Sequence, residues 1–532
     1  MTVEQICQIG KLELNDENTH IIQSYAEHIV PWLKSDEFRE KWASKPYPPL
    51  INPEKIDFNG ANALHAWTLN IPFPKYYDFV VFGSHGVGIT TAMNGFLYLC
   101  GAVGIGLSRK AKLNETDDNE KPSNKAAYIE LLKGLMAIKT LKDNQKLKEV
   151  NHIFLRLNDF IADKDAKKIY SLIDASLALH IVRDPISNLK SLVNNPEIVK
   201  KMWYSDESYD IESFEKDMKE GRLSYGALRD IALDFTQDPA KLLKQIIHYA
   251  GGKEESKPKN TEKIKKISEE EMILRPKISS VDTWMVDSTQ AFHDGVLFQL
   301  LSGSLKKCKL KQTSDFIGEK SYDCMCEICE FLGIKKPDES LAPVFSKRAA
   351  NSVAFLPLTI YANAKTPLFS DEKGSFKDKD RLTSAKIELV TAMSPVASAG
   401  YDISKYFSDI DGFDVGQIRV VVTSNDDLIK LLEAGLMDKL KRYIAALVKA
   451  IDDEFNAHSK YRFDEKDILD YFKEHKKSRQ IMSYIMNQHL LLLKSNKPEI
   501  IEGYGWYQKY LEIAKDDEPL DTTQDGVSVT NF

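Results

Sequence analysis

The stretch YDFVVFGSHGVGITTAM, Tyr77–Met93, decides the fold because it joins a strand, a glycine-rich turn and the start of a helix. Apart from Asp78, residues 77–82 form a short run of apolar, aromatic and β-branched side chains, which is typical of a strand buried on both faces in a parallel sheet. The turn follows at once, and residues 91–99 then favour a helix. We therefore predict an α/β fold with a mainly parallel central sheet and helices on both faces.

The glycine-rich turn has the form of a phosphate-binding loop without that loop's lysine. Gly83 and Gly88 fit the pattern G-x-x-x-x-G-K-[ST], but Ile89 stands where the lysine belongs. Because NTPases use that lysine to reach the β- and γ-phosphates, its loss disfavours an ATPase or GTPase. Backbone N–H groups and the positive end of the following helix still favour an anion site. The residues expected to line this site are Ser84, Gly86, Gly88, Thr90 and Thr91.

A second candidate stretch is HIVRDPISNLKS, His180–Ser191. An apolar strand, expected from residue 176 to 182, runs directly into Arg183, Asp184 and Pro185, and a helix follows. The guanidinium of Arg183 offers a planar fork to phosphate oxygens, and the hydroxyl of Ser191, eight positions later, can donate to the same group. The alternative is purely structural: the arginine pairs with a carboxylate and the proline starts the helix.

Together the two stretches resemble the sulfotransferases that use 3'-phosphoadenosine 5'-phosphosulfate (PAPS). In that family a loop ending in Gly-Thr-Thr holds the 5'-phosphosulfate, and an Arg-Asp-Pro motif with a later serine holds the 3'-phosphate. Arg183 and Ser191 match the second motif in type, spacing and setting, about 100 residues after the glycine loop. The segment CMCEICEFLGI, 324–334, looks like a later helix of the family. The resemblance covers about residues 75–335 and extends to large bacterial proteins associated with surface-glycan genes.

The resemblance implies transfer of a sulfuryl group from PAPS, without a metal, to a hydroxyl acceptor such as a sugar of a surface glycan. His85 takes the place of the family's basic loop residue and is expected to assist the leaving group. His152 is the candidate catalytic base, with Asp159 as its rival, although a structural role competes for His152. His65 and Trp67, just before the first strand, are candidates for an acceptor pocket or for packing.

Two alternatives remain open at the level of sequence. The first is a P-loop kinase or other nucleotide transferase with a degenerate loop, which would need a lysine and a magnesium-binding aspartate from elsewhere in the chain. The second is a non-catalytic protein that keeps the sulfotransferase fold and binds a partner. The loss of the basic loop residue favours this second alternative.

The remaining sequence predicts several further regions. Residues 1–75 form a helical lead-in with a proline-rich connection, and residues 76–340 form the nucleotide-binding core. The almost wholly polar segment 252–272 indicates a linker or insertion within that core. Residues 341–514 are expected to form an accessory α+β region, and residues 515–532 a disordered tail. Further strands are predicted at 281–286, 353–361, 387–393 and 418–423, and a helix capped by Ser424 or Asn425 is predicted to follow.

Composition narrows the class of protein. The 532 residues carry a net charge of −7, which argues against a nucleic-acid partner. The longest apolar run, 95–107, is shorter than the roughly 20 residues that span a bilayer, and the charged N-terminus is unlike a signal peptide. We therefore expect a soluble, cytoplasmic protein without an integral membrane segment, and leave self-association open. Cys324, Cys326 and Cys329 fit a helix better than a metal site, because the first two would lie about 200° apart on it.

Overall fold

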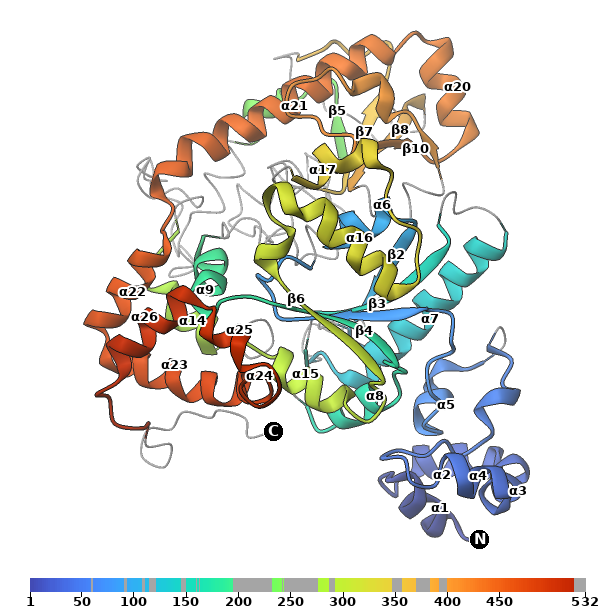
Figure 1. Cartoon of the computed structure of the whole chain (residues 1–532). Helices are drawn as coiled ribbons and strands as arrows, with labels where there is room; N and C mark the ends of the chain where they lie inside the picture. The colour runs from blue at the N-terminus through green and yellow to red at the C-terminus, as the bar shows by residue number, and fades with distance from the viewer. Residues whose placement is uncertain are drawn as a thin grey trace, which may run out of the picture.

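The computed structural model of the chain (Figure 1) describes residues 1–58, 61–89, 93–107, 111–113, 121–144, 150–158, 160–161, 163–194, 232–241, 243, 276–286, 292–346, 356–369, 383–391 and 400–520. Several predicted features lie outside these residues: Thr90, Thr91, Asp159, the segment 252–272 and the end of the tail, 521–532.

Sheet A forms the centre of the molecule (Figure 1). Among the described residues it has five parallel strands in the order β2-β3-β1-β4-β6, which confirms the predicted parallel α/β core. Its strands are β1 (Phe79–Phe82), β2 (Ala102–Gly106), β3 (His152–Leu157), β4 (Leu177–Val182) and β6 (Lys307–Gln312). Val80 of β1 is paired with Leu155 of β3 and with Ala178 of β4, so the carboxyl ends of these three strands share one edge.

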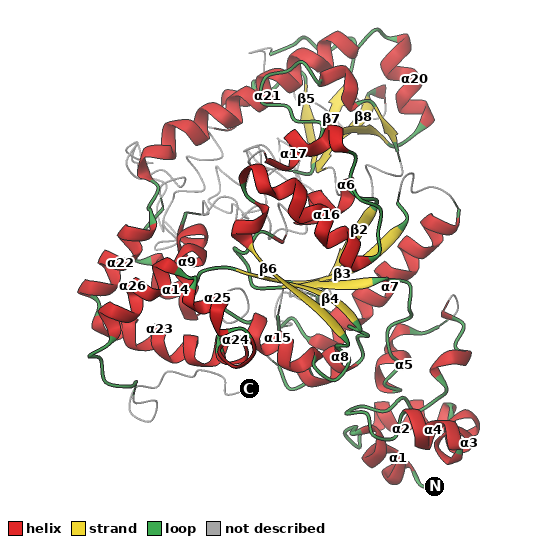
Figure 2. Ribbon diagram, viewed as in Figure 1, coloured by secondary structure: helices red, strands yellow, loops and turns green. Residues whose placement is uncertain are grey.

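Alternation along β1 explains why the sheet is covered on both faces. Phe79 and Val81 point into one apolar cluster, whereas Val80 and Phe82 point into another. The first cluster contains α6 (Asn94–Leu99) and α16 (Ser321–Leu332), and the second contains α7 (Asn124–Asp143), α8 (Ala166–Ser171) and α15 (Asp294–Leu301). Figure 2 shows α16 on one side of the sheet and α8 and α15 on the other, as predicted.

The N-terminal helices extend the second of these cores. The helices are α1 (Val3–Gly10), α2 (Asp16–Ser24), α3 (Ala26–Lys34), α4 (Asp36–Lys41) and α5 (Ala63–Thr68). The buried amide of Asn70 ties this region together, because its Nδ2 donates to the carbonyl of Gly10 at 2.8 Å and to that of Pro48 at 3.1 Å. The backbone N–H of Phe73 then donates to the carbonyl of Leu172, which anchors the segment that leads into β1.

A second sheet, sheet B, lies apart from the first (Figure 1). Its order among the described residues is β5-β7-β8-β10-β9, and its pairs are antiparallel except for β5 and β7. The strands are β5 (Ala232–Asp234), β7 (Leu358–Ala362), β8 (Ala385–Thr391), β9 (Tyr401–Asp402) and β10 (Ile418–Val422). β7, β8 and β10 correspond to three of the predicted strands, and β5 comes from the region assigned to the core.

The helix predicted after β10 is in fact two helices. Ser424 caps α20 (Asn425–Glu433), as predicted, with its Oγ accepting from the N–H of Asp427. The chain then turns at Gly435, whose φ is 64°, and α21 (Met437–His458) begins. Glycine adopts this left-handed conformation without the steric cost that other residues incur, so the apolar periodicity on either side of it belongs to two helices.

In the described part of the chain, the C-terminal helices pack against the core around sheet A and share no apolar cluster with sheet B. They are α22 (Glu465–Glu474), α23 (Lys476–His489), α24 (Leu491–Asn496), α25 (Pro498–Glu502) and α26 (Gly505–Ala514). Their apolar side chains share one cluster with α9 (Pro185–Val193) and α14 (Ser280–Val286). The predicted accessory region, 341–514, therefore divides into sheet B with its helices and a helical layer over α9.

Two local predictions are wrong. Residues 281–286 form part of α14 instead of a strand, because Val281, Trp284 and Met285 have helical spacing and are buried together against α9 and α22. The tail predicted from residue 515 is fixed at its start, since the guanidinium of Arg479 donates to both carboxylate oxygens of Asp517 at 2.7 and 2.9 Å.

The segment with the three cysteines is the helix that was predicted. Cys324 and Cys329 are buried in α16, and Gly333, with φ of 70°, ends the helix. Across the described ranges, no group of His, Cys, Asp or Glu side chains is arranged to hold a metal ion. Within the same ranges, no helix has the length and apolar character needed to span a bilayer.

Candidate functional site

The glycine loop follows β1 at the carboxyl edge of sheet A. Gly86 and Gly88 have φ values of 85° and 91°, the left-handed region in which a side chain is strained. A Cβ on Gly83 would collide with the carbonyl oxygen of Ile181 in β4, so the loop can pass this strand only as glycine. The described part of the loop ends at Ile89, which is buried beneath it.

Ser84, one of the predicted anion ligands, points into the protein. Its side chain is buried, and its Oγ donates to Oδ1 of Asp294 at 2.5 Å while accepting from the backbone N–H of His293 at 3.0 Å. The hydroxyl therefore fixes the loop to the start of α15. The structure thus gives Ser84 a positioning contact in place of the expected contact with an anion.

Asp294 is the centre of a buried polar cluster beneath the loop. Its Oδ2 lies 2.9 Å from Nε2 of His180 on β4, and its Oδ1 lies 3.2 Å from Nδ1 of His489 on α23. Burial alone would raise the pKa of Asp294, but the two histidines and the hydroxyl of Ser84 outweigh it and hold that pKa below its usual range. Burial lowers the pKa of His489. The cluster links the glycine loop, β4, α15 and α23 through one carboxylate.

His85, the predicted aid to the leaving group, is half-buried in the glycine loop. Its ring centroid lies 6.5 Å from that of His293, at the start of α15. His85 thus lies at the carboxyl edge of the sheet, beside Gly86, in the loop where it was expected to take the place of a basic residue.

His152 lies at the opposite edge of sheet A. It is the first residue of β3, its Nδ1 lies 3.3 Å from Oδ2 of Asp78, and Asp78 immediately precedes β1. Because the strands are parallel, a full strand of about 3.3 Å per residue separates His152 from the glycine loop. The structure does not bring this candidate base together with the other predicted residues; Asp78 gives it a structural partner instead.

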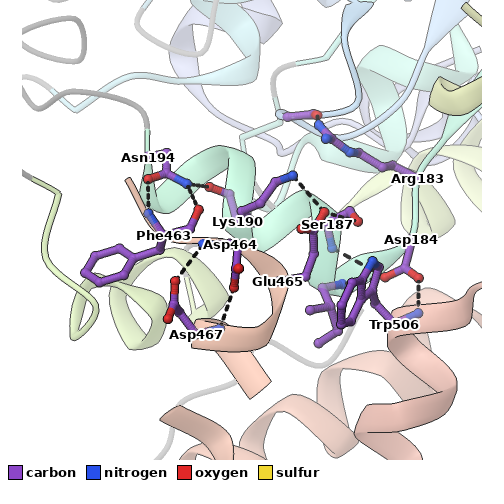
Figure 3. Close-up of polar contacts among 12 residues, drawn as sticks. Arg183, Asp184, Ser187, Lys190, Asn194, Phe463, Asp464, Glu465, Asp467 and Trp506 are labelled. Atoms are coloured by element: carbon purple, nitrogen blue, oxygen red, sulfur yellow. Dashed lines mark hydrogen bonds and ion pairs between the residues drawn. The ribbon is translucent and has the colours of Figure 1, made fainter. Parts of the chain in front are cut away.

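Arg183 is the residue that connects the two predicted motifs. It follows the last residue of β4, and its Nη1 donates to the carbonyl oxygen of Gly86 at 2.6 Å (Figure 3). The side chain is half-buried, and burial lowers the pKa of Arg183 while the nearby carboxylates of Glu465 and Asp184 oppose the shift. A guanidinium has five N–H donors, so this contact leaves donors to spare for an anion.

Asp184 caps two helices with one carboxylate (Figure 3). Its Oδ1 accepts from the backbone N–H of Ile186 at 2.9 Å, at the start of α9. Its Oδ2 accepts from the N–H groups of Trp506 and Tyr507 at 3.0 and 3.2 Å, at the start of α26. Burial raises the pKa of Asp184 against the effect of these backbone hydrogen bonds. Within the Arg-Asp-Pro motif, Pro185 therefore starts α9, as the structural alternative predicted, whereas the capping role of Asp184 was not predicted.

One half-buried face of α9 carries the hydroxyls and the cation of the second motif. Ser187, Lys190 and Ser191 share this face because they are three or four positions apart. Ser191, the predicted ligand, is half-buried. Ser187 and Lys190 both donate to Oε1 of Glu465 on α22, at 2.9 and 2.7 Å (Figure 3). Ser187 and Lys190 were not predicted from the sequence as site residues. The signal that indicates Ser187 is its position four residues from both Arg183 and Ser191, and Lys190 is adjacent to Ser191.

The strand order places both motifs at a topological switch point. The connection after β1 leads toward β2, on one side of β1, whereas the connection after β4 leads to β6, on the other side. Ligands of open α/β sheets bind in the crevice that opens between two such connections, outside the carboxyl ends of the strands. The glycine loop and Arg183 lie at this point. The fold and site thus define a parallel α/β protein with a candidate anion site at its carboxyl edge.

A separate cavity of about 550 Å³ lies among the N-terminal helices. His65 lines it, together with Tyr25 and Trp32, and the hydroxyl of Tyr25 lies 3.1 Å from Nδ1 of His65. Trp67 instead packs in the core, with Nζ of Lys168 at 4.3 Å from its ring centroid. This cavity belongs to the region that leads into the amino end of β1, away from the glycine loop.

The comparisons with known proteins concern the C-terminal part of the chain. Residues 312–516 match the model of a family described as a protein of unknown function (DUF2972). The match runs from the end of β6 to the residues just after α26, and so includes Glu465 and Trp506 but neither the glycine loop nor Arg183. Neither a curated protein nor a solved structure matches the chain.

Proposed function

We propose that the chain binds PAPS at the carboxyl edge of sheet A and transfers its sulfuryl group to a hydroxyl acceptor, such as a sugar of a surface glycan. The observation that carries this proposal is the contact of Arg183 with the carbonyl of Gly86 at 2.6 Å. It joins two motifs that are about 100 residues apart in sequence and that would hold opposite ends of one nucleotide.

The glycine loop would receive the 5'-phosphosulfate. Gly86 and Gly88 adopt left-handed conformations that let backbone N–H groups approach an anion closely. Thr90 and Thr91 would add hydroxyl donors. Because PAPS carries no γ-phosphate, this site does not need the lysine that Ile89 replaces.

The 3'-phosphate would lie against α9, between Arg183, which precedes the helix, and Ser191 in its last turn. Arg183 supplies a guanidinium beside the loop, and Ser191 supplies a hydroxyl on the half-buried face of the helix. Arginine and hydroxyl donors suit a phosphate dianion, because charge-assisted hydrogen bonds are about twice as strong as neutral ones.

The reaction would be a direct displacement at sulfur. The acceptor oxygen forms a bond to sulfur, and the bond from sulfur to the bridging phosphate oxygen breaks. 3'-Phosphoadenosine 5'-phosphate leaves with the electron pair, and the acceptor's proton passes to a base. His85, beside the phosphosulfate position, would donate a hydrogen bond to the leaving phosphate oxygen.

Calorimetry with 3'-phosphoadenosine 5'-phosphate and with adenosine 5'-phosphate tests this proposal. We expect the bisphosphate to bind and the monophosphate to bind at least tenfold more weakly, because a charged hydrogen bond contributes about 1.5–3 kcal/mol. No heat with the bisphosphate would contradict the proposed co-substrate. Equal affinity for the two nucleotides would contradict the role given to the second motif.

A further inference from the structure

A protein carboxylate contacts the half-buried face of α9 that follows Arg183. Oε1 of Glu465 accepts from Ser187 at 2.9 Å and from Lys190 at 2.7 Å (Figure 3). Glu465 is the first residue of α22 and lies 275 residues from Lys190 in the sequence. A half-buried carboxylate that accepts hydrogen bonds from a hydroxyl and an ammonium group makes the contacts that an anionic ligand would make at this face.

The surroundings of Glu465 are those of an anion site. Its side chain is 16% exposed and that of Lys190 is 28% exposed, so the pair is partly withdrawn from water. Burial would raise the pKa of Glu465, but the hydrogen bonds from Lys190 and Ser187 outweigh it and lower that pKa. Arg183 is close enough for its charge to interact with that of Glu465. Two donors, Ser187 and Lys190, thus contact one negative charge, and Arg183 interacts with it electrostatically without a hydrogen bond.

We propose that Glu465 is an internal occupant of an anion subsite formed by Ser187 and Lys190 beside Arg183, and that the 3'-phosphate of the nucleotide displaces it. The inference rests on the proposed function and adds two binding residues and a regulatory contact to it. A phosphate has three acceptor oxygens and nearly two negative charges, so it can accept from the hydroxyl, the ammonium and the guanidinium together. The contact of Glu465 holds the subsite in a closed form until then.

The same contact couples the subsite to the C-terminal helices. Asn194, at the end of α9, donates to the carbonyl of Phe463 at 2.7 Å and accepts from its N–H at 2.8 Å. Phe463 lies two residues before Glu465, so both contacts hold the start of α22 on α9 (Figure 3). Displacement of Glu465 removes one of the two and loosens the first turn of α22.

Calorimetry on full-length Glu465→Gln tests the displacement. The amide keeps the shape of the side chain but removes its charge, so the nucleotide no longer competes with a carboxylate. We expect the affinity for 3'-phosphoadenosine 5'-phosphate to rise about tenfold, or about 1.4 kcal/mol, and that for adenosine 5'-phosphate to stay unchanged. Glu474→Gln is the matched control, because Glu474 is an exposed carboxylate at the other end of α22. This variant should bind like the wild type.

The outcomes separate the two proposals. If the wild type binds the bisphosphate and Glu465→Gln binds it no better, displacement is refuted while the proposed function stands. If neither protein binds it, the proposed function fails first. Hydrogen exchange on the unmutated protein gives a second test: the bisphosphate should speed exchange of the amides of residues 463–467. Slower or unchanged exchange there, with the nucleotide bound, would overturn the inference.

Discussion

Replacement of Asp184 by alanine tests the structural half of the second motif. The carboxylate accepts from Ile186 and Ser187 on α9, at 2.9 and 3.4 Å, and from Trp506 and Tyr507 on α26, at 3.0 and 3.2 Å. Alanine removes both N-caps and leaves the first N–H groups of two helices without this acceptor. The effect should therefore appear in two helices that are far apart in the sequence.

The size of the effect follows from the caps and from the cost of burying the charge. Loss of one N-cap costs about 1 kcal/mol, within a range of roughly 0.5–2 kcal/mol. Because burial raises the pKa of Asp184, the deletion also relieves some desolvation. We therefore expect Asp184→Ala to lower the free energy of unfolding by about 2 kcal/mol, which is near the middle of the range expected for the loss of two N-caps.

Hydrogen exchange with mass spectrometry measures how much of this loss of stability occurs in α26. A loss of about 1 kcal/mol at its cap should speed exchange of the peptide 504–514 about fivefold. Glu512→Gln, an exposed change on the same helix, should leave that peptide unchanged. Unchanged exchange of α26 in Asp184→Ala, with α9 affected alone, would refute the double cap.

Three further perturbations have defined outcomes. Gly86→Ala places a side chain at a φ of 85° and should lower the free energy of unfolding by about 1–2 kcal/mol. Gly95→Ala is the control, because a Cβ at this position on α6 meets open space and should not lower the stability. Thermal unfolding of the two variants measures the difference. Burial lowers the pKa of His489, so the folded state binds fewer protons than the unfolded state, and the free energy of unfolding should fall as the pH drops below about 6.5. Urea unfolding of His489→Gln should show a free energy of unfolding that depends less on pH in this range. The same pH dependence as the wild type would contradict the role given to His489. Ser191→Ala should weaken binding of 3'-phosphoadenosine 5'-phosphate roughly ten- to a hundredfold by calorimetry, since it removes one hydrogen bond to a charged group, worth about 1.5–3 kcal/mol. Full affinity would remove Ser191 from the site.

The central fold could be predicted from sequence because local pattern and tertiary burial agree there. Residues 77–82 read as a buried strand and contain β1, and the strand expected at residues 176–182 contains β4. β6 escaped prediction because its sequence KCKLKQ alternates lysine with other residues. It is an edge strand, and Lys309 and Lys311 pair with Glu327 of α16, so a charged segment can complete the sheet.

The candidate site could be predicted only in part. The positions of Gly86 and Arg183 follow from strand order, since both come directly after neighbouring parallel strands. No local pattern indicates that Asp294 would accept from Ser84, or that Glu465 would contact Lys190, because these partners are 210 and 275 residues apart. Such contacts depend on how α15 and α22 pack, which periodicity does not specify.

The most direct test of the central claim is the affinity of Arg183→Ala for 3'-phosphoadenosine 5'-phosphate, measured by calorimetry beside the wild type. We predict a loss of roughly ten- to a hundredfold, the equivalent of about 1.5–3 kcal/mol for a charged hydrogen bond to phosphate, with the affinity for adenosine 5'-phosphate affected much less. Equal affinity of the two proteins for the bisphosphate would contradict the claim that the glycine loop and the second motif hold one nucleotide.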